Sequence, residues 1–149
     1  MSTYLTIADV TSRLTGSSYQ TGWEALTVDQ QNYGINKAQR LFESLNHQGS
    51  KYDCNQELMY PRYFEGYSIP INDDMLQGLA IESYYQGANL NQDSKLLIAA
   101  QNILEEWQGD TKAVYGSSAK EESKYLSMKF KSLEACELIY PWLSKTARY

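Results

Sequence analysis

The chain has 149 residues, a net charge of -5 at pH 7 and an aromatic content of 13%. A domain of this length buries roughly 70% of the surface that its unfolded chain exposes, so we expect one domain over residues 1–149 that needs no covalent staple. Cys54 and Cys136 lack the spacing of a disulfide framework or a metal site, which favours reduced intracellular thiols, with Cys136 in the core. We expect a soluble protein without a signal peptide, because no basic region precedes an apolar run and no stretch reaches the roughly 18 apolar residues of a membrane span.

The charge is distributed unevenly along the chain. Residues 1–111 hold six Lys or Arg and fourteen Asp or Glu, a balance of -8, whereas residues 112–149 hold seven and four, a balance of +3. An acidic body repels the phosphate backbone, whose neutralisation by basic side chains supplies most non-specific affinity for nucleic acids. Tight general binding of DNA is therefore not expected.

Two N-terminal helices are predicted from capping residues and apolar spacing. The first begins after Thr6, with Asp9 completing a capping pair, and ends at Gly16. A linker carrying Trp23 follows. Thr27 and Gln30 then cap a helix that runs from Val28 to about Asn46. Its buried face would hold apolar residues at helical spacing: Ala38, Leu41, Phe42 and Leu45.

The middle of the chain predicts two loops and another helix. Residues 46–55 are polar, and Tyr63–Ser68 forms a loop with aromatic residues and one glycine. Pro70 suits a first helical position, which places Asp73 and Asp74 in the first turn, where the helix dipole favours negative charge. The buried stripe of this helix would contain Leu76, Leu79, Ala80, Ser83 and Tyr84.

The C-terminal half predicts further helices separated by an extended segment. Apolar residues from Leu96 to Trp107 recur at helical spacing, and an extended arm or β-hairpin is expected around residues 109–118. A last helix would run from Leu126 to Tyr140, since Pro141 disfavours helical geometry in the residue before it. The predicted fold class is thus mainly α: a small helical bundle with a short arm, a C-terminal helix and a tail over residues 141–149.

Catalytic chemistry has little support in the sequence. His47 is the only histidine, and we expect it to be partly exposed at a helix end, where its ring can bond the last carbonyls. No nucleophile elbow or phosphate-binding glycine loop is present. The acidic pairs Asp73-Asp74 and Glu105-Glu106 would point about 100° apart on a helix and so would not converge. We therefore expect a protein that is not an enzyme, with no catalytic, metal or cofactor-binding residues and no cofactor.

An ordered set of short motifs covers nearly the whole chain. It comprises Tyr4–Asp9, Trp23, the helix with Ala38, Arg40, Leu41 and Leu45, Met59–Arg62, Ile69-Pro70, Gly109-Asp110 before Val114-Tyr115, and Leu138–Leu143. In this order and spacing the motifs resemble a family of small bacteriophage head-tail connector proteins, also called adaptor or head-completion proteins. Some members are also described as similar to a single-stranded-DNA-binding replication protein.

The resemblance implies a structural virion protein made in the host cytoplasm. About twelve copies would form an adaptor ring in the phage neck, linking the portal protein to the next neck or tail protein. The ring would form part of the DNA channel, and genomic DNA would pass its acidic lumen without specific binding. No membrane partner is implied.

Loop aromatics and the tail supply the candidate contact residues, because tyrosine and tryptophan suit surfaces that are apolar at one point and hydrogen-bonded at another. Candidates for subunit or neck contacts are Tyr60, Arg62, Tyr63, Tyr67 and Tyr115. Candidates for portal docking are Trp142, Lys145, Arg148 and Tyr149, in a tail that leaves the core after Pro141 and can be deleted without loss of the fold. Alternatively, Trp142 and Leu143 pack back on the bundle.

Two other functions stay open at this point. A single-stranded-DNA-binding protein of phage replication would use the basic C-terminal third together with Tyr125, Trp142 and Tyr149. A small hydrolase or nuclease would need a metal site, and only scattered acidic residues support one.

Overall fold

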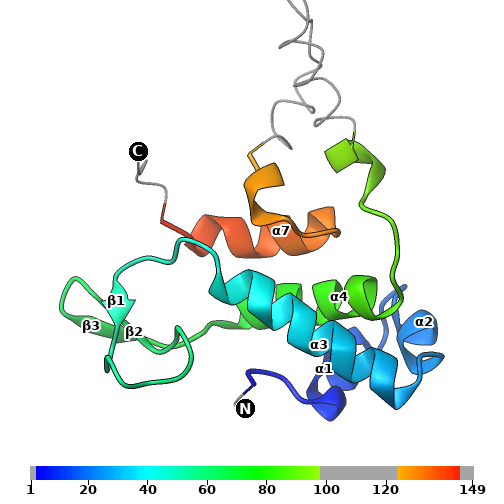
Figure 1. The fold of residues 1–149 in the computed structure, drawn as a ribbon, viewed down its shortest axis with the longest axis horizontal. Helices are drawn as coiled ribbons and strands as arrows, with labels where there is room; N and C mark the ends of the chain where they lie inside the picture. Colours follow the sequence, from blue (N-terminus) through cyan, green and yellow to red (C-terminus); the bar gives the residue numbers. More distant parts are fainter. Residues whose placement is uncertain (1–2, 98–123, 145–149) are drawn as a thin grey trace, which may run out of the picture.

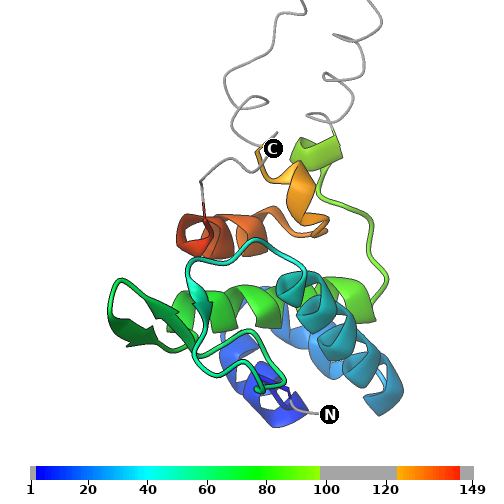
Figure 2. The same cartoon turned by 60° about the vertical axis from the view of Figure 1, so that its left-hand side comes forward.

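The protein is mainly helical. The structure, a computed structural model, describes residues 3–97 and 124–144. Helices α3 (Val28–Glu43) and α4 (Asp73–Gly87) lie side by side, with α7 (Leu133–Ile139) on one side of the pair and α1 (Ile7–Leu14) on the other (Figures 1 and 2). This arrangement confirms the predicted fold class. The predicted arm at residues 109–118 and most of the helical pattern up to Trp107 lie outside the described residues, although residues 94–97 are helical.

Two helices, α1 and α2 (Gln20–Glu24), lie before α3, where the sequence predicts one helix followed by a linker. At α1, Thr6 accepts a hydrogen bond from the Asp9 amide while the Asp9 carboxylate accepts one from the Thr6 amide, which confirms the capping pair. The linker contains α2 as a short additional helix. Trp23 on α2 is fully buried, and its indole nitrogen donates to the Thr11 hydroxyl at 2.9 Å. One buried aromatic residue thus fixes α2 against α1.

Helix α3 confirms its predicted cap, and its predicted buried face in part: Leu41 is half-buried, and Leu45 lies beyond the end of the helix. The Thr27 side chain accepts from the Gln30 amide, and Gln30 returns a bond to the Thr27 amide. Ala38 and Phe42 are fully buried. The helix ends at Glu43, three residues before the predicted end at Asn46. The chain then turns back at His47, whose ring contacts the Phe42 carbonyl in the last turn of α3.

Helix α4 begins later than predicted. Its N-cap is Asn72, whose side chain accepts from the Met75 amide at 2.9 Å, so Pro70 precedes the helix instead of opening it. A side-chain acceptor at Asn72 satisfies a free amide of the first turn, which Pro70 cannot do. Asp73 lies in that turn as predicted and pairs with Arg13 of α1 at 3.0 Å.

The last helix is broken in two, in contrast to the single helix predicted from Leu126 to Tyr140. A 3-10 turn, η1 (Leu126–Met128), is followed by Lys129 in a left-handed conformation with φ of 62°. Ser132 then caps α7 by accepting from the Ala135 amide. The α-helix ends before Pro141, as predicted, and Pro141 lies in a second 3-10 turn, η2 (Tyr140–Trp142).

A small antiparallel sheet forms where loops were predicted. Its order is β1 (Ser50–Lys51), β2 (Arg62–Phe64) and β3 (Tyr67–Ile69), with Tyr63 opposite both Ser50 and Ser68. Glu65 and Gly66 join β2 to β3 with positive φ angles of 51° and 87°, which suits a tight two-residue hairpin turn. The sheet lies at one end of the helical body (Figure 1).

The hydrophobic core lies between the helices. Its largest fully buried apolar side chains come from α1, α2, α3, α4, α7 and the segments beside them: Trp23, Phe42, Phe130, Leu14, Ile81, Leu96, Met128 and Ile139. Cys136 is also buried, as predicted, and burial raises the pKa of its thiol. Within residues 3–97 and 124–144, no helix combines the length and apolar character needed to cross a bilayer.

Candidate functional site

Three of the five exposed large aromatic side chains in the described residues lie on or next to the sheet. Tyr52, which follows β1, and Tyr63 and Tyr67 of the hairpin are 60%, 47% and 75% exposed. The rings of Tyr52 and Tyr63 lie 6.3 Å apart between centroids. Tyrosine is enriched at protein interfaces because it covers a large area at low conformational entropy and also offers a hydroxyl. We call Tyr52 and Tyr63 the tyrosine face; Tyr67, which pairs with Phe64, lies on the other side of the hairpin.

The tyrosine face is held by a buried arginine on the opposite side of β2. Arg62 donates from Nε to the Gln48 carbonyl, from Nη2 to the Gly49 carbonyl at 2.7 Å and from Nη1 to the Met59 carbonyl at 3.3 Å. The side chain is only 6% exposed. This corrects the prediction that Arg62 contacts another subunit: its donors are used inside the chain, where they fix the sheet to the loop after α3.

Tyr60 is also buried, which corrects its assignment as a contact residue. Its hydroxyl lies 3.1 Å from Nδ1 of His47, and its amide donates to the hydroxyl of Tyr4. Tyr4 in turn donates to the Glu43 carboxylate at 2.9 Å. The Phe42 and Tyr60 rings stack 5.7 Å apart. Burial raises the pKa of Tyr60 to about 12, so its hydroxyl keeps its proton at neutral pH.

His47 lies inside this network. Its Nε2 is 2.7 Å from the Phe42 carbonyl, which can only accept, so Nε2 carries a proton and Nδ1 accepts from the Tyr60 hydroxyl. The ring does bond a carbonyl at the end of α3, as predicted, but it is 2% exposed and not partly exposed. Burial lowers the pKa of His47 to about 4, and the nearby Arg62 charge acts in the same direction. The ring is therefore a neutral structural group.

The start of the C-terminal tail packs on the fold. Leu143 is buried and forms an antiparallel bridge with His47, and the Ser144 amide donates to the Asn46 carbonyl at 2.9 Å. This corrects the prediction that the tail leaves the core directly after Pro141. Trp142 is 42% exposed and stays available to a partner. Lys145, Arg148 and Tyr149, like Tyr115, lie outside the described residues.

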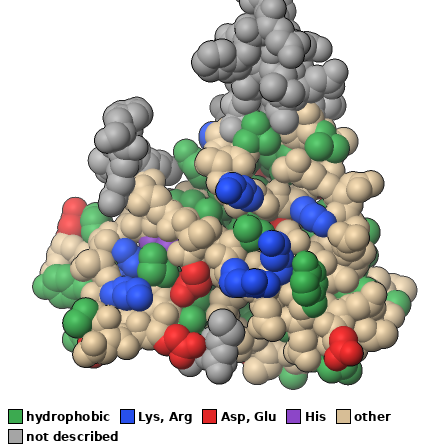
Figure 3. All heavy atoms as spheres, in the orientation of Figure 1, with side chains coloured by type: hydrophobic (Ala, Val, Ile, Leu, Met, Phe, Trp, Pro, Cys, Tyr) green, Lys and Arg blue, Asp and Glu red, His purple; other side chains and the backbone are tan. Residues whose placement is uncertain are grey.

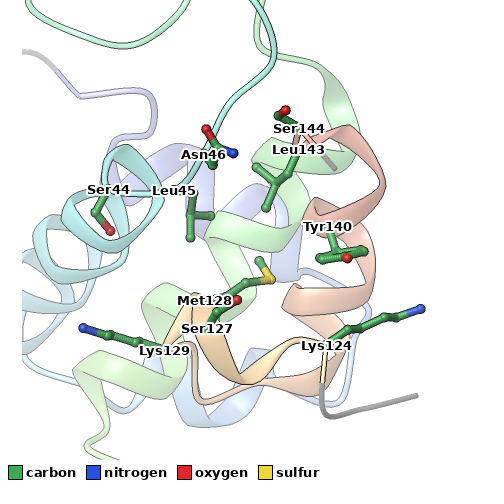
Figure 4. Close-up of a pocket in the computed structure, with 10 residues that line it drawn as sticks. All are labelled: Ser44, Leu45, Asn46, Lys124, Ser127, Met128, Lys129, Tyr140, Leu143 and Ser144. Atoms are coloured by element: carbon green, nitrogen blue, oxygen red, sulfur yellow. The ribbon is translucent and has the colours of Figure 1, made fainter. Parts of the chain in front are cut away.

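A surface pocket of about 510 Å³ lies between the end of α3, η1 and the start of the tail. Figure 4 shows Leu45, Met128 and Leu143 pointing toward its middle, while Lys124 and Lys129 lie on opposite sides of it. The Lys124 ammonium is 5.5 Å from the centroid of the Tyr140 ring, which also lines the pocket. None of the ten described residues that line it is acidic. The pocket thus combines an apolar middle with basic sides.

The buried carboxylate of Glu82 organises α7 and not a reaction. It accepts hydrogen bonds from the Lys131 and Ser132 amides and from the Gln86 side chain. Asp93 accepts a bond from the next amide, that of Leu133. Together these carboxylates satisfy free amides at the N-terminus of α7. Among the described residues, no three His, Cys, Asp or Glu side chains are grouped so that they could hold a metal ion.

Comparison with known proteins returns no relative. No family model matches the chain, and neither a curated protein nor a solved structure is detectably similar to it.

Sequence reasoning identified part of this site. The structure exposes the predicted Tyr63 and Tyr67 on opposite sides of the hairpin and brings Tyr52, which was not predicted, beside Tyr63. Trp142 lies on a separate segment at the start of the tail. The pocket was not predicted, because its lining comes from segments about 80 residues apart in sequence. A signal for the inward side of β2 was present: Tyr60, Arg62 and Phe64 alternate with exposed positions at the period of a strand.

Proposed function

We propose that the protein is a structural subunit of the neck of a tailed bacteriophage. About twelve copies form an adaptor ring that links the portal to the tail and surrounds the passing DNA. The observation that carries this proposal is the tyrosine face, presented on a sheet that Arg62 holds rigidly to the helical body. Ring subunits need two contact surfaces each, because a head-to-tail contact joins two different faces of the same chain.

Other features support this proposal. Trp142 offers an exposed aromatic residue away from the sheet, at the start of the tail proposed to dock on the portal. Lys145, Arg148 and Tyr149 extend that portal contact in the proposal, and Tyr115 adds to the contacts with neighbouring subunits. The acidic balance of residues 1–111 suits a channel that DNA must pass without binding.

Assembly tests the proposal directly. The purified protein, alone at high concentration and mixed with the portal of the same phage, is examined by native mass spectrometry and negative-stain microscopy. Closed rings of about twelve copies are expected. A variant with Tyr63→Ala and Tyr67→Ala should assemble poorly, whereas Tyr33→Ala, at an exposed tyrosine on α3, serves as the matched control. Monomers under every condition, with the portal present, would contradict the proposal.

Single-stranded DNA binding is the second candidate function, and one observation favours it. Basic side chains gather over the middle of the face shown in Figure 3. Near the pocket, Lys124 lies over the Tyr125 ring at 5.1 Å, and Lys129 is exposed. Aromatic rings beside basic groups are typical of single-strand sites.

An oligonucleotide titration separates the two functions. For the adaptor, fluorescence anisotropy should give a dissociation constant no tighter than the roughly 10⁻⁴ to 10⁻⁶ M of non-specific binding. A submicromolar constant that weakens steeply with salt would favour the DNA-binding function instead.

A further inference from the structure

The turn between β2 and β3 forms a projecting tip with a defined chemistry. We call residues 63–67 the hairpin tip. Tyr63, Glu65 and Tyr67 are exposed. The turn at Glu65 and Gly66 is short, so the tip presents one carboxylate at its end, with the Tyr67 ring on one side of the hairpin and the Tyr63 ring on the other. Arg62, directly before the tip, is bound to three carbonyls. The tip is therefore pre-organised, which lowers the entropy cost of binding.

The pocket described above has the opposite chemistry. Lys124 and Lys129 carry positive charge on two sides, and buried Met128 and Leu143 form an apolar floor. In Figure 4 the two ammonium groups point away from each other, so they do not converge on one small anion. A volume of about 510 Å³ lies within the range of roughly 300 to 1,000 Å³ that is usual for ligand pockets. An aromatic ring over the floor with an acidic group beside it at the rim would use both properties.

The tip and the pocket of one chain lie far apart. Figures 1 and 2 both show the β2–β3 turn at one end of the molecule and η1, which carries Met128, near the other side of α7. A contact between the tip and the pocket must therefore join two copies of the chain. Since the two faces differ, it is heterologous, and repeating it produces a ring when the rotation closes.

We propose that the hairpin tip of one copy inserts into this pocket of the next copy, with Glu65 paired to Lys129 and Tyr67 over the floor formed by Met128 and Leu143. This contact rests on the proposed ring and names the surfaces that build it. The exposed Glu65 at the tip and the basic rim supply the charge complementarity that sets direction and register.

A charge exchange tests the pairing in the full-length protein. Glu65→Lys and Lys129→Glu should each raise the concentration needed for half-maximal assembly by about tenfold or more, because each places like charges together. The variant that carries both changes should assemble nearly as well as the wild type. Lys95→Glu, at another exposed lysine, is the control for the loss of one positive charge.

Cysteine cross-linking tests the same contact geometrically. In a background with Cys54→Ser, which removes the exposed native thiol, Glu65→Cys and Lys129→Cys proteins are mixed with a short bismaleimide cross-linker. A cross-linked dimer of the two variants is expected, because the linker spans the separation that two long paired side chains leave, whereas a direct disulfide would need Cα atoms within roughly 7 Å. A mixture of the Glu65→Cys and Lys95→Cys proteins is the control and should give no cross-linked dimer.

The outcomes separate this contact from the ring itself. Rings that form equally well with Glu65→Lys or Lys129→Glu, without the specific cross-link, would overturn the tip-and-pocket contact and leave the proposed ring intact. A wild-type protein that stays monomeric even with the portal would overturn both.

Discussion

Gly34 of α3 lies directly against Ser83 of α4. A Cβ atom added at Gly34 would clash with the Ser83 carbonyl oxygen and would lie only 2.8 Å from the backbone nitrogen of Gly87. The two central helices thus meet at their backbones, and the absence of a side chain at Gly34 sets how closely they approach.

The first prediction follows from this contact. Gly34→Ala should lower the free energy of unfolding by about 1 to 3 kcal/mol, because a methyl group inserted between two backbones forces the helices apart. Alanine usually favours a helix over glycine, so a loss identifies the packing clash as the stronger effect. Urea denaturation gives the value. Asn36→Ala, at an exposed position of the same helix, should be neutral or stabilising.

The second prediction concerns acid stability at His47. The pKa of the folded state, about 4, lies below the ordinary value of 6.5, so the unfolded chain binds the proton more readily. Stability is therefore lost as the pH falls from about 6.5 toward 4, by up to about 3 kcal/mol. Urea denaturation across this range should show the decline, and a His47→Gln variant should show less of it. A wild type and variant with parallel pH profiles would contradict the buried neutral ring.

Glu82 gives a third prediction, with the opposite sign. Burial raises the pKa of this carboxyl above its ordinary value, although the amides of Lys131 and Ser132 partly oppose the shift. The folded state therefore holds the proton more tightly, and stability is lost as the pH rises from about 4.5 toward the raised pKa.

The comparison with Glu82→Gln isolates this effect. The variant keeps an acceptor for the α7 amides but does not titrate. The free energy of unfolding of the wild type minus that of the variant should fall as the pH rises between about 4 and 7. A difference that grows with pH would mean that the amide hydrogen bonds outweigh burial and lower the pKa.

The fourth prediction compares two neighbours at the start of the tail. Leu143→Ala should destabilise the fold by about 2 to 5 kcal/mol, since Leu143 is buried against the segment that contains His47. Trp142→Ala removes a larger but partly exposed side chain and should cost less in stability while weakening the proposed portal contact. Thermal denaturation and portal pull-down measure the two effects. Equal loss of stability in both variants would place Trp142 in the core as well.

Features that depend on neighbouring residues were predicted well from the sequence. The Thr6 and Thr27 caps each involve a partner three residues away, and both formed as predicted. The end of α3 and the start of α4 were displaced by a few residues because His47 and Asn72 satisfy backbone groups at points that periodicity does not mark.

Features that depend on distant residues were missed. The strands are two or three residues long, and β2 is held by Arg62 through carbonyls up to fourteen residues away. The break at Lys129 carries no glycine or proline, and the start of α7 is fixed by Glu82 about fifty residues earlier. For the candidate site, loop composition correctly predicted that Tyr63 and Tyr67 are exposed. It could not show that Tyr60 and Arg62 are buried.

The hydrogen bonds of Asp93 bear on how many residues can separate it from α7. The Asp93 amide donates to the Lys131 carbonyl at 2.9 Å, and the Asp93 carboxylate accepts from the Leu133 amide, so these two segments are held together on either side of residues 98–123. The entropy of closing a loop grows only with the logarithm of its length, by about 0.6 kcal/mol for each doubling. A change in the number of residues between 97 and 124, which are outside the described ranges, therefore adds little loop-closure entropy cost to the body that holds the tip and the pocket.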